Sequence, residues 1–144
     1  MINNADRTVL NETVKNTRMA VQSIETILNR VDDEDLSYEL NCQEEKYKKI
    51  EKKAVNRLKD YNTKVQDDSI PQKLMIKSSI QAKTLMNNGS KHIADMMIQG
   101  STKGITELSK VLNENKNASK SVCEIAKELV DFEEKNIERL KTYL

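Results

Sequence analysis

The first candidate for chemistry in this chain is its single histidine, His92. Asp95 and Gln99 follow it at steps of three and four residues, which place the three side chains along one stripe of a helix. Iron, manganese and zinc ions accept imidazole nitrogen together with oxygen ligands. Carboxylates from other helices would complete such a site, and the candidates are Glu25, Glu39 and Glu107. The sequence therefore predicts His92, Asp95 and Gln99 as candidate metal ligands.

A full carboxylate-bridged di-iron centre does not fit this chain. Such centres in four-helix bundles use a Glu-x-x-His motif on each of two helices. The residue three positions before His92 is Gly89, and no Glu-x-x-His occurs anywhere. A reduced site for one Fe, Mn or Zn ion stays open. So does an alternative without any cofactor, in which Asp95 simply orients His92 at a helix surface.

The sequence contains no motif that supports nucleophilic catalysis or the binding of a phosphate group. Cys42 and Cys123 form no Cys-x-x-Cys pair, and the only imidazole base for either thiol is His92. Gly100 and Gly104 lack the following Lys-Ser/Thr of a phosphate-binding loop. We expect this glycine pair to admit Phe132 against the helix backbone instead. The sequence predicts no catalytic residue, and a non-enzymatic protein is the favoured interpretation.

The composition indicates which elements must position these residues. The chain has 144 residues, one domain's worth, with 3% aromatic residues, three glycines and one proline. Strands favour aromatic and β-branched residues, and turns favour Gly and Pro, so this composition predicts an all-α protein. We expect a single domain over residues 1–144.

Apolar residues recur at steps of three and four in four long segments. The predicted seam residues are Leu10, Val14, Thr17, Val21, Ile24, Leu28 and Val31; then Leu36, Leu40, Gln43, Tyr47, Ile50, Ala54, Leu58 and Tyr61; then Leu74, Ser78, Ala82, Leu85, His92, Met96, Gly100, Leu108 and Val111; and finally Val122, Ile125, Leu129, Phe132, Asn136, Leu140 and Tyr143. The polar members Gln43 and Asn136 are typical of residues that set helix register.

The connections between these segments have clear signals. The acidic run 32–35 predicts a helix N-terminus, and residues 62–70 before Pro71 predict a loop. In the last segment, Ser119 or Ser121 is the expected N-cap. The third segment, 72–114, is one long helix or two. We expect it to continue, with at most a kink, past 87–90 and 100–102.

Four such segments predict an antiparallel up-down four-helix bundle, with a long or kinked third helix. A continuous third helix would overhang the other three. An overhang needs a partner, so a homo-oligomer, most simply a homodimer, is expected.

The charges argue against two classes of partner. The chain has 24 Lys and Arg against 23 Asp and Glu, for a net charge of +1. Basic residues cluster at 46–59, but acidic residues interrupt them, which is typical of a solvated face rather than of a nucleic-acid or membrane site. A weak polyanion site there remains an alternative. Because no membrane-length apolar run or secretory signal is present, we expect a cytoplasmic protein.

Two stretches carry a family resemblance: HIADMMIQGSTKGI at 92–105 and FEEKNIERL at 132–140. Together with the first two helical segments and their acidic turn, they resemble an uncharacterised family of small bacterial helical-bundle proteins with a ferritin-like arrangement. The resemblance implies a ferritin-like bundle and carries over no site residue. The favoured function is self-assembly or partner binding. The alternative is a degenerate ferritin-like metal-binding or redox protein that uses His92 with neighbouring carboxylates.

Overall fold

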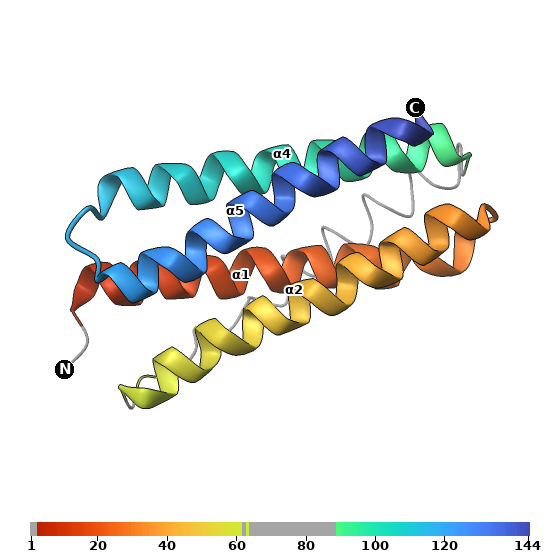
Figure 1. Cartoon of the computed structure of the whole chain (residues 1–144). Helices are drawn as coiled ribbons and strands as arrows, with labels where there is room; N and C mark the ends of the chain where they lie inside the picture. Colours follow the sequence, from red (N-terminus) through yellow and green to blue (C-terminus); the bar gives the residue numbers. More distant parts are fainter. Residues whose placement is uncertain (1–2, 62, 64–88) are drawn as a thin grey trace.

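The computed structural model describes residues 3–61, 63 and 89–144, and every regular element within these ranges is helical. The long helices are α1 (Asn4–Ile27), α2 (Glu34–Asp60), α4 (Ser90–Glu114) and α5 (Lys120–Leu140) (Figure 1). Two short 3₁₀ turns, η1 (Leu28–Arg30) and η2 (Lys141–Tyr143), follow α1 and α5. The prediction of an all-α protein is confirmed for the described residues. The predicted loop at 62–70, Pro71 and the first part of the third segment lie outside them.

Side-chain caps explain where the first two long helices begin. The Asn3 side chain accepts a hydrogen bond from the Asp6 backbone N–H at 2.6 Å, and the Asp33 side chain accepts one from Leu36 at 3.0 Å. The predicted acidic N-terminus of the second helix is thus confirmed. The Asp6 carboxylate also accepts the backbone N–H of Ser119 at 2.6 Å, which ties the start of α1 to the start of α5.

The expected continuity of the third segment past residues 87–90 is wrong. Helix α4 begins at Ser90, and Gly89 before it has the extended angles φ −65° and ψ 153°. A glycine inside a helix costs about 1 kcal/mol relative to alanine, which is consistent with Gly89 preceding the helix as its N-cap. The helix then continues without a break through Gly100 and Gly104 to Glu114, as expected.

The core confirms most of the predicted seams. In α2 every predicted position except the half-buried Tyr61 is buried: Leu36, Leu40, Gln43, Tyr47, Ile50, Ala54 and Leu58. In α4 the predicted Leu108 is buried, but the prediction for the first half of the helix was wrong by one residue. Ile93, Met97 and Ser101 are buried there, rather than His92, Met96 and Gly100.

The pattern in α4 fits two adjacent faces of the helix, because apolar residues stand side by side at Met96 and Met97. Only packing against the other helices selects one of these faces. Helix α1 packs chiefly against α2, and α4 chiefly against α5, while α1 and α2 also contact α5. No helix among the described residues is long and apolar enough to cross a membrane.

Candidate functional site

The structure brings together two of the three predicted metal ligands. Asp95 and Gln99 are exposed, and the Gln99 amide donates to the Asp95 carboxylate at 3.1 Å. His92 is half-buried, and its Nε2 atom is buried with no hydrogen-bond partner. Within the described ranges, no group of three or more His, Cys, Asp or Glu residues is arranged to hold a metal ion. Metal binding by His92, Asp95 and Gln99 therefore stays a prediction.

The carboxylates proposed to complete that site form other contacts. Each lies within ion-pair distance of a basic side chain: Glu25 of Lys48 at 3.7 Å, Glu39 of Arg139 at 3.8 Å, and Glu107 of Lys103 at 4.0 Å. Their charges are thus compensated by basic residues on α2, α5 and α4.

A second group of polar residues lies inside the bundle, and we call it the buried polar cluster: Tyr47 of α2, Ser101 of α4, and Glu133 and Asn136 of α5. Their side chains retain only 1%, 5%, 4% and 0% exposure. The Asn136 amide donates to the Tyr47 hydroxyl at 3.2 Å, while Tyr47 and Ser101 are hydrogen-bond partners of the Glu133 carboxylate. Phe132 packs edge-on against the Tyr47 ring, with centroids 4.9 Å apart. Three helices therefore position one carboxylate.

Burial dominates the electrostatics of this cluster. It raises the pKa of Glu133 from 4.5 to about 7, although hydrogen bonds from Ser101 and Tyr47 oppose the change. Burial, followed by the nearby charge of Glu133, also raises the pKa of Tyr47 well above its ordinary value. No Lys or Arg of the described residues forms an ion pair with Glu133. At neutral pH this carboxyl group can both take up and release a proton.

Gly104 allows α4 to pass close to the cluster. A methyl group at this position would lie 3.4 Å from the Asn16 side-chain oxygen and 3.7 Å from Glu133 Oε1. The expectation that Gly100 and Gly104 admit Phe132 is therefore wrong. Polar side chains approach Gly104, and no atom lies within 4 Å of the corresponding position at Gly100.

Sequence reasoning missed Ser101 and Glu133, although a signal for Glu133 existed. It stands four residues after Leu129 and three before Asn136, both of which were predicted to face the core. Phe132 satisfies the same pattern and is apolar, so the pattern predicts Phe132 rather than Glu133 in the core.

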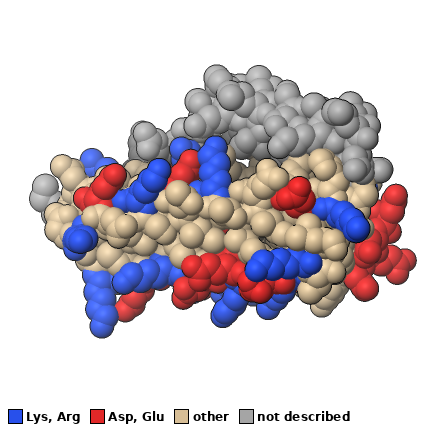
Figure 2. Space-filling view, turned by 90° about the horizontal axis from the view of Figure 1, so that it is seen from above, with Lys and Arg blue, Asp and Glu red and all other residues tan. Residues whose placement is uncertain are grey.

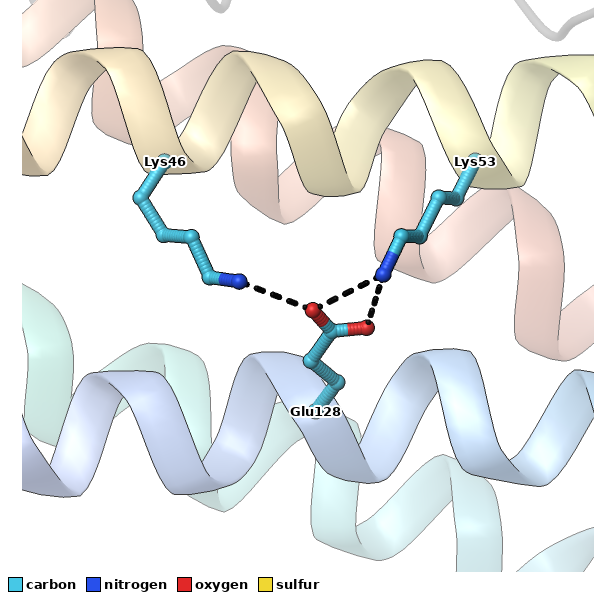
Figure 3. Close-up of polar contacts among 3 residues, drawn as sticks. All are labelled: Lys46, Lys53 and Glu128. Atoms are coloured by element: carbon cyan, nitrogen blue, oxygen red, sulfur yellow. Dashed lines mark hydrogen bonds and ion pairs between the residues drawn. The ribbon is translucent and has the colours of Figure 1, made fainter.

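A different carboxylate of α5, Glu128, bridges to α2 at the surface (Figure 3). Lys46 donates to its Oε1 at 2.9 Å, and Lys53 lies 3.0 and 2.9 Å from its two oxygens. Burial raises the pKa of Glu128, but the two lysines outweigh this effect and the pKa is lowered. This group links α2 to α5 and offers no chemistry beyond the ion pairs.

The outer face of α2 separates charges along its length. Its exposed charged and aromatic residues begin with Glu34, Asp35, Tyr38 and Glu45, and continue with Lys48, Lys49, Lys52, Lys53 and Lys59, followed by Asp60; the uncharged Asn41, Cys42 and Asn56 are exposed between them. Tyr38 is 72% exposed. We call this surface the α2 outer face. Figure 2 shows both signs of charge interspersed over the face of the molecule seen from above, with acidic groups gathered at one end.

Comparison with known proteins found no matching family model, no similar curated protein and no similar solved structure. The resemblance to small bacterial ferritin-like bundles therefore stays a prediction.

Proposed function

We propose that this protein is a non-enzymatic helical bundle of the cytoplasm that acts by self-assembly, as a homodimer formed through the α2 outer face. The observation that carries the proposal is the division of charge along this face. Its first part bears Glu34, Asp35 and Glu45, and most of its second part is lysine. An antiparallel pair of α2 helices around a twofold axis places each acidic part against the partner's basic part.

The exposed Tyr38 adds to this interface. It lies on the same face as Glu34 and Glu45, and its ring is the most exposed large hydrophobic group of the described residues. Tyrosine is enriched at protein interfaces, because an apolar ring and a polar hydroxyl suit a partly wet contact.

The proposal includes an antiparallel up-down order of the helices in a ferritin-like arrangement. Contacts between α2 and α5 support opposite directions for these two helices. Residue 39 meets 139, residues 46 and 53 meet 128, and residue 57 meets 121. As the residue number increases along α2, the residue number of the contacting residue on α5 decreases, which is the pattern of two helices that run in opposite directions.

Sedimentation of the full chain at low and high salt tests assembly. We expect a dimer at low salt that dissociates as salt rises, because exposed charges are screened. The double variant Lys49→Glu/Lys52→Glu should weaken the dimer about tenfold or more. Its matched control is Lys103→Glu/Lys110→Glu on the exposed side of α4.

Adding Glu34→Lys/Glu45→Lys to the α2 variant restores the complementarity and should restore the dimer. A strict monomer at high concentration would contradict the proposal. Equal weakening by the α2 and α4 variants would contradict the location of the interface.

A second candidate, a metal-binding or redox protein, is favoured by the buried and unpartnered Nε2 of His92. Elemental analysis of untagged protein should then find stoichiometric Fe, Mn or Zn that is lost in His92→Ala. Absence of metal after reconstitution would reject it.

A further inference from the structure

The Glu133 carboxylate is incompletely satisfied. One oxygen, Oε2, is buried and has no hydrogen-bond partner. The partners of Glu133 in the cluster are the uncharged hydroxyls of Tyr47 and Ser101. A buried carboxylate without a counter-charge is costly, so this position favours a ligand that brings positive charge.

Two more buried amide oxygens, one on α5 and one on α2, lack a donor. Asn136 uses its amide nitrogen to donate to the Tyr47 hydroxyl, and its Oδ1 is unpartnered. Gln43 uses its amide nitrogen to donate to Glu39 at 3.0 Å, and its Oε1 is unpartnered. A carboxylate only accepts, so Glu39 fixes the amide orientation of Gln43. The Tyr47 hydroxyl uses its proton on Glu133 and therefore accepts from Asn136, which fixes the second amide, so both free atoms are acceptor oxygens.

The three side chains occupy matching positions on two packed helices. Glu133 and Asn136 stand one turn apart on α5, and both hydrogen-bond with Tyr47 of α2. Gln43 stands one turn from Tyr47 on α2 and is 1% exposed. One carboxylate and two amide oxygens, all buried, are a donor set that suits a hard cation.

We propose that Glu133, Asn136 and Gln43 bind one monovalent alkali-metal cation inside the bundle, with Tyr47 positioning the first two. The charge decides the class of ion. A single positive charge neutralises the one carboxylate, whereas a divalent ion would leave an unpaired charge in an apolar interior. The lack of any group of three His, Cys, Asp or Glu in the described parts argues against a transition metal at this point.

Thermal unfolding of the full chain tests the site. The measurement is made at pH 8, where Glu133 is ionised, in sodium or potassium chloride and in choline chloride of equal ionic strength. A bound ion stabilises only the folded state, so the midpoint should rise by about 2–4 °C when the ion exceeds its dissociation constant about fivefold. Glu133→Gln should abolish this alkali-specific rise. The matched control Glu128→Gln, on the same helix, should keep it.

A direct measurement covers the case in which Glu133→Gln does not fold. The sodium NMR line should broaden with wild-type protein and sharpen again when potassium competes. Equal midpoints in all three salts, together with no broadening, would overturn the proposal. If the unfolding midpoint of folded Glu133→Gln still rises in sodium or potassium chloride, the ion does not bind at Glu133, and the proposed location is overturned. A larger rise in magnesium chloride that also needs Glu133 would overturn the monovalent class.

Discussion

Glu128 and Glu133 lie on the same helix, five residues apart, in opposite surroundings. Glu128 lies near the surface between Lys46 and Lys53, and its pKa is lowered. Glu133 is 4% exposed among hydroxyl and amide groups, and its pKa is about 7. Five residues turn a helix by about 140°, so one carboxylate meets the basic side of α2 while the other enters the core. The neighbouring helices, rather than the residue type, set the charge of each group at neutral pH.

The largest expected effect is a pH dependence of stability that comes from Glu133. Its pKa is higher in the folded chain than the ordinary 4.5, so the folded state holds the proton more tightly. The resulting stability is fully present below about pH 4.5 and is lost as pH rises to about 7 and beyond. The difference amounts to about 3 kcal/mol. Urea unfolding from pH 4.5 to 8 should show this decline in wild type.

Glu133→Gln removes the titrating group and should flatten the same curve. Glu128 provides the contrast, because its lowered pKa means that its contribution is lost only as pH falls below the ordinary range. Parallel pH curves for wild type and Glu133→Gln would show that the two carboxylates do not differ as described.

The next largest effect should come from Tyr47→Phe. This change removes the hydroxyl that partners Glu133 and accepts from Asn136, and it leaves the ring in place. We expect a loss of about 1–3 kcal/mol at pH 8 in the free energy of unfolding, because buried polar groups lose a partner. The decline of stability with pH should also become larger and extend to higher pH, since a hydrogen bond that lowers the pKa of Glu133 is gone.

Tyr61→Phe is the control for that measurement. The Tyr61 hydroxyl accepts from Arg57 at 2.8 Å in a half-buried position. Its loss should change stability by no more than about 0.5 kcal/mol, as for most surface substitutions. If Tyr47→Phe and Tyr61→Phe lower the free energy of unfolding equally, the hydroxyl in the buried polar cluster contributes no more than one near the surface.

The smallest effect should come from Glu128→Gln. Its lysine partners have side chains that are 41% and 55% exposed, and such pairs contribute about 1 kcal/mol or less. The loss should shrink further in choline chloride, which screens the surface charges. The control is Glu124→Gln, an exposed glutamate one turn earlier on α5. If Glu128→Gln lowers the free energy of unfolding as much as Tyr47→Phe does, the surface ion pairs matter as much as the buried polar cluster, contrary to this prediction.

The candidate site was only partly predictable. Gln43 and Asn136 were recognised as polar residues of the seam, and both are buried. Glu133 and Ser101 were not recognised, because a glutamate or serine beside an apolar residue is usually a surface residue in a helical pattern. His92 is the single imidazole of the sequence and places the predicted metal ligands on α4, where Asp95 and Gln99 are exposed.

By itself, the sequence determined the helical class, the buried stripe of α2 and the start of α2 at the acidic turn, and it limited the start of α5 to Ser119 or Ser121, of which the structure has Ser119. These features depend on local periodicity and on caps within a few residues, which a pattern reports directly. Only the tertiary structure decided which face of α4 is buried and that Glu133 meets Tyr47. Both depend on how helices distant in sequence rotate against one another, and a carboxylate enters the core only where other helices supply its partners.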